Sequence, residues 1–317
     1  MSQRGGRSEG AFSRPLVVAA AAVLCTLLWG SAVPCVRLGF SLFGIAASDT
    51  GDQFVFAGVR FVLAGGCVVA ANALATRSSP LPDRQHLRDA AALSCFQTSG
   101  QYLLYYVGLA HATGVSGSIV QGVSVFVALL VAALAFRMER ITAPKLLGCA
   151  IGFAGVALAD VGGASTGGGF TFMGEGLVML SSVCSAISAV LVRRLTTSHG
   201  TNAVVLSGWQ FVIGGATLVV VGLALGGSFS MDTWPQAGLL AWIVMVSAVA
   251  YSLWGVLLSH NDVSRVTVYS FLVPVFGVLL SLAILGDEGH PVTALTFVSL
   301  ALVALGIVIV NRAPKER

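Results

Sequence analysis

The sequence predicts an all-α integral membrane protein with ten transmembrane helices, and three observations lead to this prediction. Apolar residues make up 56% of the 317 residues and charged residues only 9%, whereas a soluble domain carries about a quarter charged residues. Long apolar stretches recur along the chain, each close to the roughly 20 residues that a helix needs to cross a bilayer. Arginine and lysine fall almost entirely between alternate stretches, a pattern that a soluble protein has no reason to produce.

The apolar stretches are continuous and lack the alternation of a barrel strand, so helices are favoured over strands. Short polar tails are expected at 1–14 and 313–317. Between them, the approximate cores of the spans lie at 15–36, 53–75, 90–110, 113–136, 143–160, 174–192, 202–224, 236–259, 265–286 and 291–311.

The positions of the basic residues predict the topology. If the N-terminus is cytoplasmic, fifteen of the seventeen arginines and lysines fall on the cytoplasmic side. Only Arg37 falls outside, and only Arg60 lies within a span. Because cytoplasmic loops of membrane proteins are enriched in basic residues, we expect both termini to be cytoplasmic. Abundant arginine, alanine and glycine are typical of GC-rich bacterial genomes, which favours a multi-pass protein of the inner (plasma) membrane.

Composition also indicates what the chain does not use. The six cysteines are widely spaced in apolar stretches without a CxxC pair, so we expect neither disulfides nor a metal site. No GxxxxGK loop is present, so neither ATP binding nor another cofactor is expected. The net charge of +4 follows from the topology and indicates no nucleic-acid partner. The expected partners are the lipid bilayer and a small-molecule solute.

The chain contains an internal duplication with an offset of about 150 residues. VFAGVRFVLAGGCVV (55–69) matches VLSGWQFVIGGATLV (205–219), with Arg60 opposite Gln210. At an offset of 149, Tyr102 and His111 match Tyr251 and His260. A third patch begins at Val123 and Val273, in the same order. Three ordered patches at nearly one offset indicate two repeats, which we place at 15–161 and 174–312, joined by a glycine-rich linker at 162–173.

Each repeat contains five predicted spans, and an odd number makes the second repeat enter the membrane from the opposite side. Inverted repeats of this kind exchange inward-open and outward-open shapes around a site near mid-membrane. Glycines permit close approach of two helices. The duplicated patches therefore predict close helix contacts at Gly58, Gly65, Gly66, Gly208, Gly214 and Gly215.

Several segments together resemble the drug/metabolite transporter superfamily, in its ten-helix EamA-type branch. They are LLWGSAVPCVRLGF (27–40), RF (60–61), YYVGLAHATGVSGSIV (105–120), FRMERIT (136–142) and VPVFGVLLSLAILGDE (273–288). The resemblance covers about residues 15–312. It implies a secondary transporter of small metabolites, often one that exports amino acids or their analogues. Ser124 departs from the pattern, because the equivalent residue of the second repeat is Pro274.

Polar side chains at membrane depth tend to face the bundle interior or a water-filled cavity, because facing lipid is costly. In the third span, Gln97, Gln101 and Tyr105 recur every four residues on one helical face. These groups suit a zwitterionic or amphipathic solute, or else join helices by hydrogen bonds. The full set of predicted substrate-binding residues is Arg60, Gln97, Gln101, Tyr105, Gln121, Gln210, Tyr251 and Trp254.

Arg60 lies about eight residues below the outer end of its span, roughly 10 Å deep at 1.5 Å per residue. Burying it unpaired costs at least about 2.5 kcal/mol. We expect it either to attract a substrate carboxylate or gate the outer mouth, or to snorkel outward or pair with Asp49, Asp52 or another outer-facing acid.

Three further residues are candidates for hinging or gating: Pro274, Glu139 and Glu288. Pro274 deletes a backbone hydrogen bond and is expected to bend its helix. Glu139 and Glu288 end the fourth and ninth spans on opposite sides, where capping is the alternative role.

Two other functions stay open at this point, a lipid flippase and a membrane-embedded lipid-modifying enzyme. An enzyme would need histidines clustered with acids at one interface. The five histidines instead fall in five different connections on both sides, so we expect no enzymatic activity.

Overall fold

The computed structural model describes residues 11–46, 48–77, 79, 81–111, 125–161, 171–285 and 294–312, and every regular element within these ranges is a helix. The first repeat begins with η1 (Ala11–Ser13), α1 (Pro15–Phe43) and α2 (Thr50–Thr76). A continuous helical segment follows, composed of α3 (Arg84–Ser94), the π-helix η2 (Cys95–Gly100) and α4 (Gln101–His111). Residues 125–135 are helical and end in η3 (Val131–Ala135), and α6 (Ala143–Val161) follows them.

The second repeat begins with η4 (Phe172–Gly176) and α7 (Leu177–Ser198), followed by α8 (Ala203–Ala224) and α9 (Trp234–His260). A further helical run contains α10 (Val263–Thr267), η5 (Val268–Phe271) and α11 (Leu272–Leu285), and α12 (Ala294–Arg312) is last. Five helical segments of the described residues are long and apolar enough to cross a membrane: Pro15–Phe43, Thr50–Thr76, Phe172–Ser198, Ala203–Ala224 and Trp234–His260. Shorter apolar helices accompany them at Val125–Ala135, Ala143–Gly155, Val263–Gly277 and Phe297–Arg312.

Local signals explain where several helices begin and end. Asn202 starts α8 because its side chain accepts hydrogen bonds from the amides of Val204, at 2.8 Å, and Val205. Thr233 and Gln236 form a capping box at the start of α9. Gly44 ends α1 with a φ of +66°, which glycine adopts without strain. Since α1 runs to Phe43, Arg37 lies within this helix and not in the connection where the sequence placed it.

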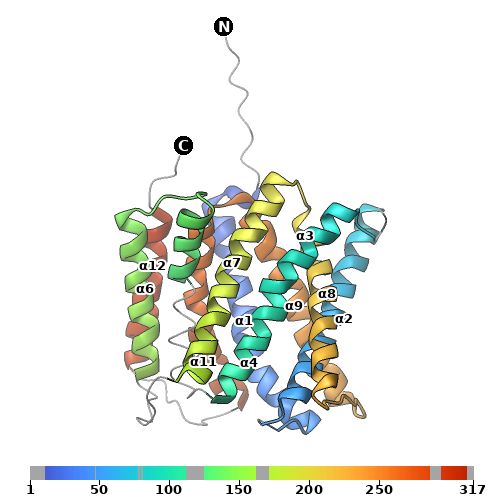
Figure 1. Ribbon diagram of the computed structural model, residues 1–317. Coiled ribbons are helices and arrows are strands. Elements are labelled where there is room, and N and C mark those ends of the chain that lie inside the picture. The colour runs from blue at the N-terminus through green and yellow to red at the C-terminus, as the bar shows by residue number, and fades with distance from the viewer. Residues whose placement is uncertain are drawn as a thin grey trace.

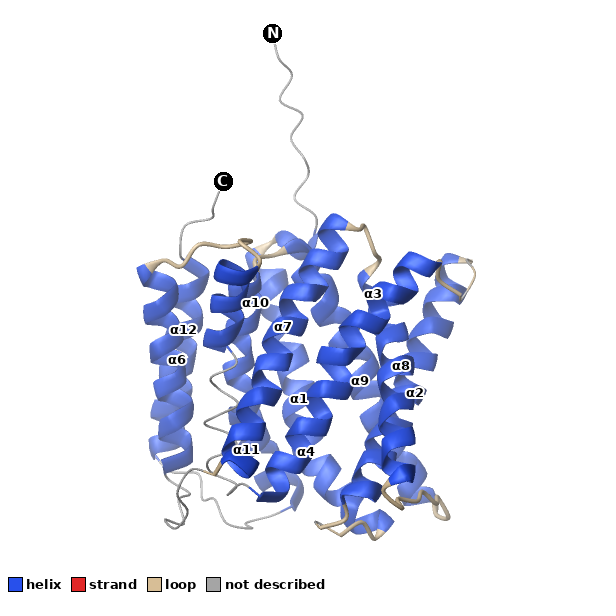
Figure 2. Cartoon of the chain, in the orientation of Figure 1, coloured by secondary structure: helices blue, strands red, loops and turns tan. Residues whose placement is uncertain are grey.

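The helices stand side by side in one bundle, with α6 and α12 at one flank and α2 and α8 at the other (Figure 1). Helices α1, α4, α7 and α9 lie between the two flanks (Figures 1 and 2). Glycine brings the α2 and α8 backbones into contact: a Cβ atom on Gly58 would lie 2.6 Å from the carbonyl oxygen of Gly215, and one on Gly65 would lie 2.5 Å from that of Gly208. Helices α6 and α12 are joined in the same way at Gly148 and Gly306.

One of the predicted close contacts is not observed. A Cβ atom on Gly66 would meet nothing within 4 Å, because this residue is one helical position away from the α8 face. Gly214 makes a close contact with the third helical segment, since its Cβ position lies 2.5 Å from Cβ of Thr98. The other four glycines make close contacts between α2 and α8.

The bundle has two chemically different ends. We call one the basic end, because the described ends of helices that gather there carry Arg14, Arg77, Arg84, Arg88, Arg137, Arg140, Lys145, Arg193, Arg194, Arg265 and Arg312 (Figure 1). Hydrogen bonds connect its elements, such as the one that the side-chain amide of Asn261 donates to the carbonyl of Phe12 at 2.9 Å. At the opposite end, the amide of Ser228 donates to Asp52 at 2.6 Å and the side chain of Gln236 donates to the carbonyl of Leu42 at 2.9 Å.

Candidate functional site

An aromatic cluster occupies the middle of the bundle, where α2, α4, α8 and α9 meet. We call Phe61, Tyr102, Phe211 and Tyr251 the aromatic centre. The hydroxyls of Tyr102 and Tyr251 lie 3.1 Å apart. The rings of Phe61 and Phe211 stack with centroids 4.9 Å apart. Both pairs join residues that the sequence repeat aligns with each other, so the two halves of the chain meet here through equivalent side chains.

The remaining contacts within the aromatic centre repeat this equivalence. Phe61 packs edge-to-face on Tyr102 at 4.7 Å, and Phe211 packs edge-to-face on Tyr251 at 4.9 Å. Edge-to-face pairs at such distances contribute about 0.5–1.5 kcal/mol each beyond the burial of their area. The contacts among the four rings therefore stabilise the packing of the two halves against each other.

Two tryptophans extend the cluster beyond Tyr251. The ring of Trp29, on α1, lies 5.0 Å from Tyr251 and 4.9 Å from Trp254, in edge-to-face geometry in both cases. The indole Nε1 of Trp29 is buried and finds no hydrogen-bond partner in the described part of the chain.

Arg60 lies beside the aromatic centre and is only 4% exposed. Its guanidinium carbon is 4.3 Å from the centroid of the Phe61 ring and 5.7 Å from that of Tyr102. Cation–π contacts of this kind contribute about 0.5–2 kcal/mol, less than the cost of hiding the charge. The Nε atom is buried without a hydrogen-bond partner, and no carboxylate of the described residues forms an ion pair with the guanidinium.

The two acids expected as partners of Arg60 are engaged elsewhere. Asp49 caps α2 by accepting a hydrogen bond from the amide of Asp52 at 3.3 Å, and Asp52 accepts from the amide of Ser228. Both acids lie at the start of α2, whereas Arg60 is ten residues after Thr50, about 15 Å along the helix. Neither Asp49 nor Asp52 is therefore the counterion of Arg60 in the structure.

Gln210 occupies the position of α8 that is equivalent to Arg60 and is fully buried. Its Oε1 accepts a hydrogen bond from the hydroxyl of Thr98 at 2.6 Å, while its Nε2 is buried without a partner among the described residues. Buried donors are normally paired, and each exception calls for a cause. Three unpaired N–H donors, on Arg60, Gln210 and Trp29, thus surround the aromatic centre, and a ligand with acceptor oxygens fits them.

The third helical segment faces this cluster through residues that differ from those predicted. Thr98 contacts Gln210 of α8, Tyr102 contacts α9 and α2, and Tyr106 contacts α2. Gln97 is buried in η2, and Gln101 and Tyr105 are half-buried in α4. The contacting residues are each one position further along the chain than the predicted set, which places them about 100° around the helix.

The other predicted residues are distributed as follows. Trp254 and Tyr251 belong to the cluster, and Pro274 lies inside α11. Gln121 and Glu288 lie outside the described residues. Sequence reasoning missed Trp29, Thr98 and Tyr102. For Tyr102 a signal was available, because the repeat aligns it with Tyr251, which the prediction included.

Glu139 joins the two halves at the basic end, between η3 and α6. It is buried, and Lys145 donates to its Oε2 at 2.9 Å. The amide of Ser264, at the start of α10, donates to Oε1 at 3.0 Å, and the Ser264 hydroxyl donates to Oε2. Burial raises the pKa of Glu139, but the hydrogen bonds from Ser264 and Lys145 and the Lys145 charge outweigh it and hold the pKa below its usual value.

A second polar contact between the two halves lies at the basic end and involves Asp89 of α3. Both oxygens of its carboxylate lie 3.0 Å from Nδ1 of His199, and the hydroxyl of Thr201 donates to one of them at 2.8 Å. Together with Glu139–Ser264, it ties the first half of the chain to the second at this end. These are the contacts that would have to break or move if the basic end opened.

Comparisons with known proteins agree with these features. A model of the EamA-like transporter family matches the chain twice, at residues 16–159 and 172–312. The uncharacterized transporter YyaM of Bacillus subtilis is 26% identical over 220 residues, which are 67% of this chain and 70% of the relative. A probable terminal-alkyne amino-acid exporter of Streptantibioticus cattleyicolor is 25% identical over 302 residues, 92% of each chain.

The fold also has a counterpart among crystal structures. One protein of known structure superposes with a TM-score of 0.72 over 93% of this chain and 96% of its own, at 18% sequence identity. This likeness concerns the fold alone. The double match to the family model covers nearly the whole of the two halves that meet at the aromatic centre, and the chain therefore belongs to the EamA-like transporter family.

Proposed function

We propose that this chain is a secondary or facilitative transporter that exports a small organic solute bearing a carboxylate, such as an amino acid or a related compound. The observation that carries the proposal is the buried, unpaired guanidinium of Arg60 beside two further unpaired donors, Gln210 Nε2 and Trp29 Nε1. A carboxylate offers two acceptor oxygens and a negative charge, which is the complement of this set. The direction of transport and the amino-acid class follow the family and the relative named as an amino-acid exporter.

The proposed architecture is ten spans in two inverted five-helix repeats, with both termini cytoplasmic. Helices in equivalent positions contact each other, α2 with α8 and α6 with α12, as expected around a pseudo-two-fold axis. The contacts of α1 with α9 and α11 correspond to those of α7 with α4 and η3. The basic residues at one end support a cytoplasmic face there.

In the proposed mechanism, the two repeats rock about the aromatic centre and expose the Arg60 site first to one side and then to the other. At the basic end, Glu139–Ser264 and Asp89–His199 separate when the site faces the cytoplasm. At the opposite end, Asp52–Ser228 and Gln236–Leu42 separate when the solute is released. Glu139 thereby acts as a gate residue, with Glu288 as its candidate counterpart in the second repeat and Pro274 as a candidate hinge.

Efflux from reconstituted vesicles tests the proposal. Purified protein is placed in liposomes preloaded with a radiolabelled panel of neutral and acidic amino acids, nucleosides and sugars. We expect faster efflux of at least one carboxylate-bearing solute than from protein-free liposomes, and no efflux of the sugars. Transfer of fluorescent lipid between leaflets without solute efflux would replace the proposal with a lipid flippase.

A further inference from the structure

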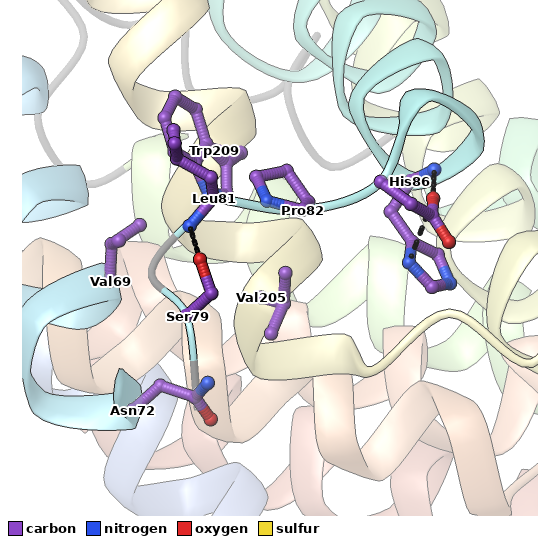
Figure 3. A pocket seen from close by; sticks show the side chains of 9 residues that line it. Val69, Asn72, Ser79, Leu81, Pro82, His86, Val205 and Trp209 are labelled. Atoms are coloured by element: carbon purple, nitrogen blue, oxygen red, sulfur yellow. Dashed lines mark hydrogen bonds and ion pairs between the residues drawn. The ribbon is translucent and has the colours of Figure 1, made fainter. Parts of the chain in front are cut away.

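A cavity lies at the basic end, away from the aromatic centre, between the end of α2 and the start of α8. Its volume is about 300 Å³. Val69 and Asn72 line it from α2, and Val205 and Trp209 line it from α8 (Figure 3). The remaining lining residues lie between α2 and the first turn of α3: Ser79, Leu81, Pro82, Asp83 and His86. Its wall therefore combines apolar side chains with an amide, a hydroxyl and an imidazole.

The repeat shows why the two helices separate here. At the opposite end, the equivalent parts of α2 and α8 are closed by Gly51, Gly222 and Gly227: a Cβ atom on Gly222 would lie 2.8 Å from the carbonyl oxygen of Gly51. At the offset of 150 residues, these glycines correspond to Thr201, Asn72 and Arg77 at the basic end. Larger side chains thus occupy the positions where glycine lets the two helices approach at the other end. The cavity therefore results from a sequence difference between the two repeats, and the pseudo-symmetry alone would not produce it.

The mouth of this cavity has the character of a bilayer interface. Leu81, in its wall, is 70% exposed, and Leu74, on the last turns of α2, is 81% exposed. Tryptophan, as at position 209, is the residue that prefers the headgroup level of a membrane. Exposed large apolar groups beside a polar cavity are stable only where lipid covers them.

The charge around the cavity is positive. Arg77 precedes the lining segment and Arg84 lies within it between Asp83 and His86; both are exposed, and Arg88 follows one helical turn later. The acid of the lining, Asp83, is used to start α3: it accepts a hydrogen bond from the amide of His86 at 2.8 Å and lies 3.2 Å from Nδ1 of the same residue. The amide side chain of Asn72 makes no hydrogen bond to the described residues.

We propose that this cavity binds the headgroup of an anionic phospholipid from the leaflet at the basic end. The phosphate is attracted by Arg77 and Arg84, the glycerol is placed to hydrogen-bond Asn72, and the upper part of an acyl chain covers Val69, Val205 and Trp209. Bound there, the lipid fills the gap between the two halves at the end where the glycine contacts stop.

Lipid retention by the purified full-length protein tests this proposal. The protein is extracted from vesicles with equal amounts of phosphatidylglycerol and phosphatidylcholine, and the lipids that stay bound are measured by native mass spectrometry. The wild type is expected to retain phosphatidylglycerol in preference. Arg84→Gln should lower that retention about fivefold, the size expected for one basic group near an anionic surface. Trp209→Ala should lower it as well, because the ring that covers the acyl chain is removed.

Two matched variants serve as controls: Arg312→Gln, a basic residue on α12 at the same end, and Trp234→Ala, an exposed tryptophan at the opposite end. Both should retain lipid like the wild type. Arg84 is exposed, so its variant keeps the fold and remains informative if Trp209→Ala does not. Equal retention of the two lipids, or equal loss in the controls, would contradict the proposal. Complete displacement by millimolar glycerol 1-phosphate would also contradict it, by assigning the cavity to a soluble phosphate ester.

Discussion

At the scale of single residues, Arg60 is a residue that costs the fold stability and that a role in solute binding would explain. It is a buried cation whose Nε has no partner in the described part of the chain, and its equivalent in the second repeat is the neutral Gln210. A fold alone has no use for a charge at this depth, because an unpaired arginine within a span costs at least about 2.5 kcal/mol. The cost is explained if a solute provides the counter-charge during transport.

Replacing Arg60 by methionine should therefore stabilise the protein and abolish transport. Without solute, we expect the free energy of unfolding in detergent to rise by about 2 kcal/mol, because an uncompensated charge is removed from a buried position. Arg312→Met, at an exposed site, is the control and should change neither quantity. A wild-type rate of solute efflux in Arg60→Met would remove Arg60 from the site.

The Glu139–Lys145 pair gives a second prediction at this scale. Both side chains are 2% exposed, so removing either partner leaves the other charge buried. Glu139→Gln and Lys145→Met should each lower the free energy of unfolding by about 3 kcal/mol, and the double variant should lose less than the sum.

The same pair makes stability depend on pH. Because the pKa of Glu139 is lowered on folding, its contribution is complete above the pKa of the unfolded chain and is lost as the pH falls through the folded value. The difference in melting temperature between wild type and Glu139→Gln should thus be full at pH 7 and shrink towards pH 3. A difference that stays constant over this range would show that the Glu139 carboxylate is not the titrating group.

At the scale of the helices, glycine determines how closely α2 and α8 approach. Gly65 and Gly66 are neighbours, yet only Gly65 faces α8: its Cβ position lies 2.5 Å from the backbone oxygen of Gly208, whereas Gly66 faces open space. The contact involves backbone, which cannot rotate away as a side chain would. Adding one methyl group at Gly65 therefore has to move a helix.

These two glycines form a matched pair for mutagenesis. Gly65→Ala should destabilise the protein by about 1–3 kcal/mol through overpacking. Gly66→Ala should stabilise it by about 0.5–1 kcal/mol, because alanine loses less entropy than glycine in a helix. Thermal unfolding of both variants measures the contrast, and equal shifts would mean that α2 and α8 do not approach along the Gly65 face.

The helices also show which features the sequence could predict. The apolar stretches predicted the helical class and the approximate helix positions. The repeated glycines predicted close helix contacts, which α2 and α8 make at Gly58, Gly65, Gly208 and Gly215. The facing side of the third segment was harder, because Gln97, Gln101 and Tyr105 have the same four-residue spacing as Thr98, Tyr102 and Tyr106, so spacing alone does not choose between the two faces. Thr98 was missed for this reason. Trp29 was missed because an apolar pattern treats a buried tryptophan as a core residue.

At the scale of the whole molecule, the account depends on two repeats that face opposite ways. Equivalent residues meet at Tyr102–Tyr251 and Phe61–Phe211, and polar contacts between the halves occur at both ends of the bundle. If the repeats are inverted, the contacts at the two ends have the same role, because each end in turn closes the same central site. If the repeats were parallel, equivalent connections would lie on one face of the membrane, and the contacts at the two ends could not have equivalent roles.

Ser79 and Ser228 lie at equivalent places in the two repeats, at an offset of 149 residues, in the α2–α3 and α8–α9 connections. A single cysteine at each place, probed with a membrane-impermeant maleimide on intact and permeabilised cells, measures the face on which it lies. The wild type, whose own cysteines lie within helices, serves as background. We expect Ser228→Cys to be labelled on intact cells and Ser79→Cys only after permeabilisation. Labelling of both from the same side would contradict the inverted arrangement and, with it, the alternating-access site at Arg60.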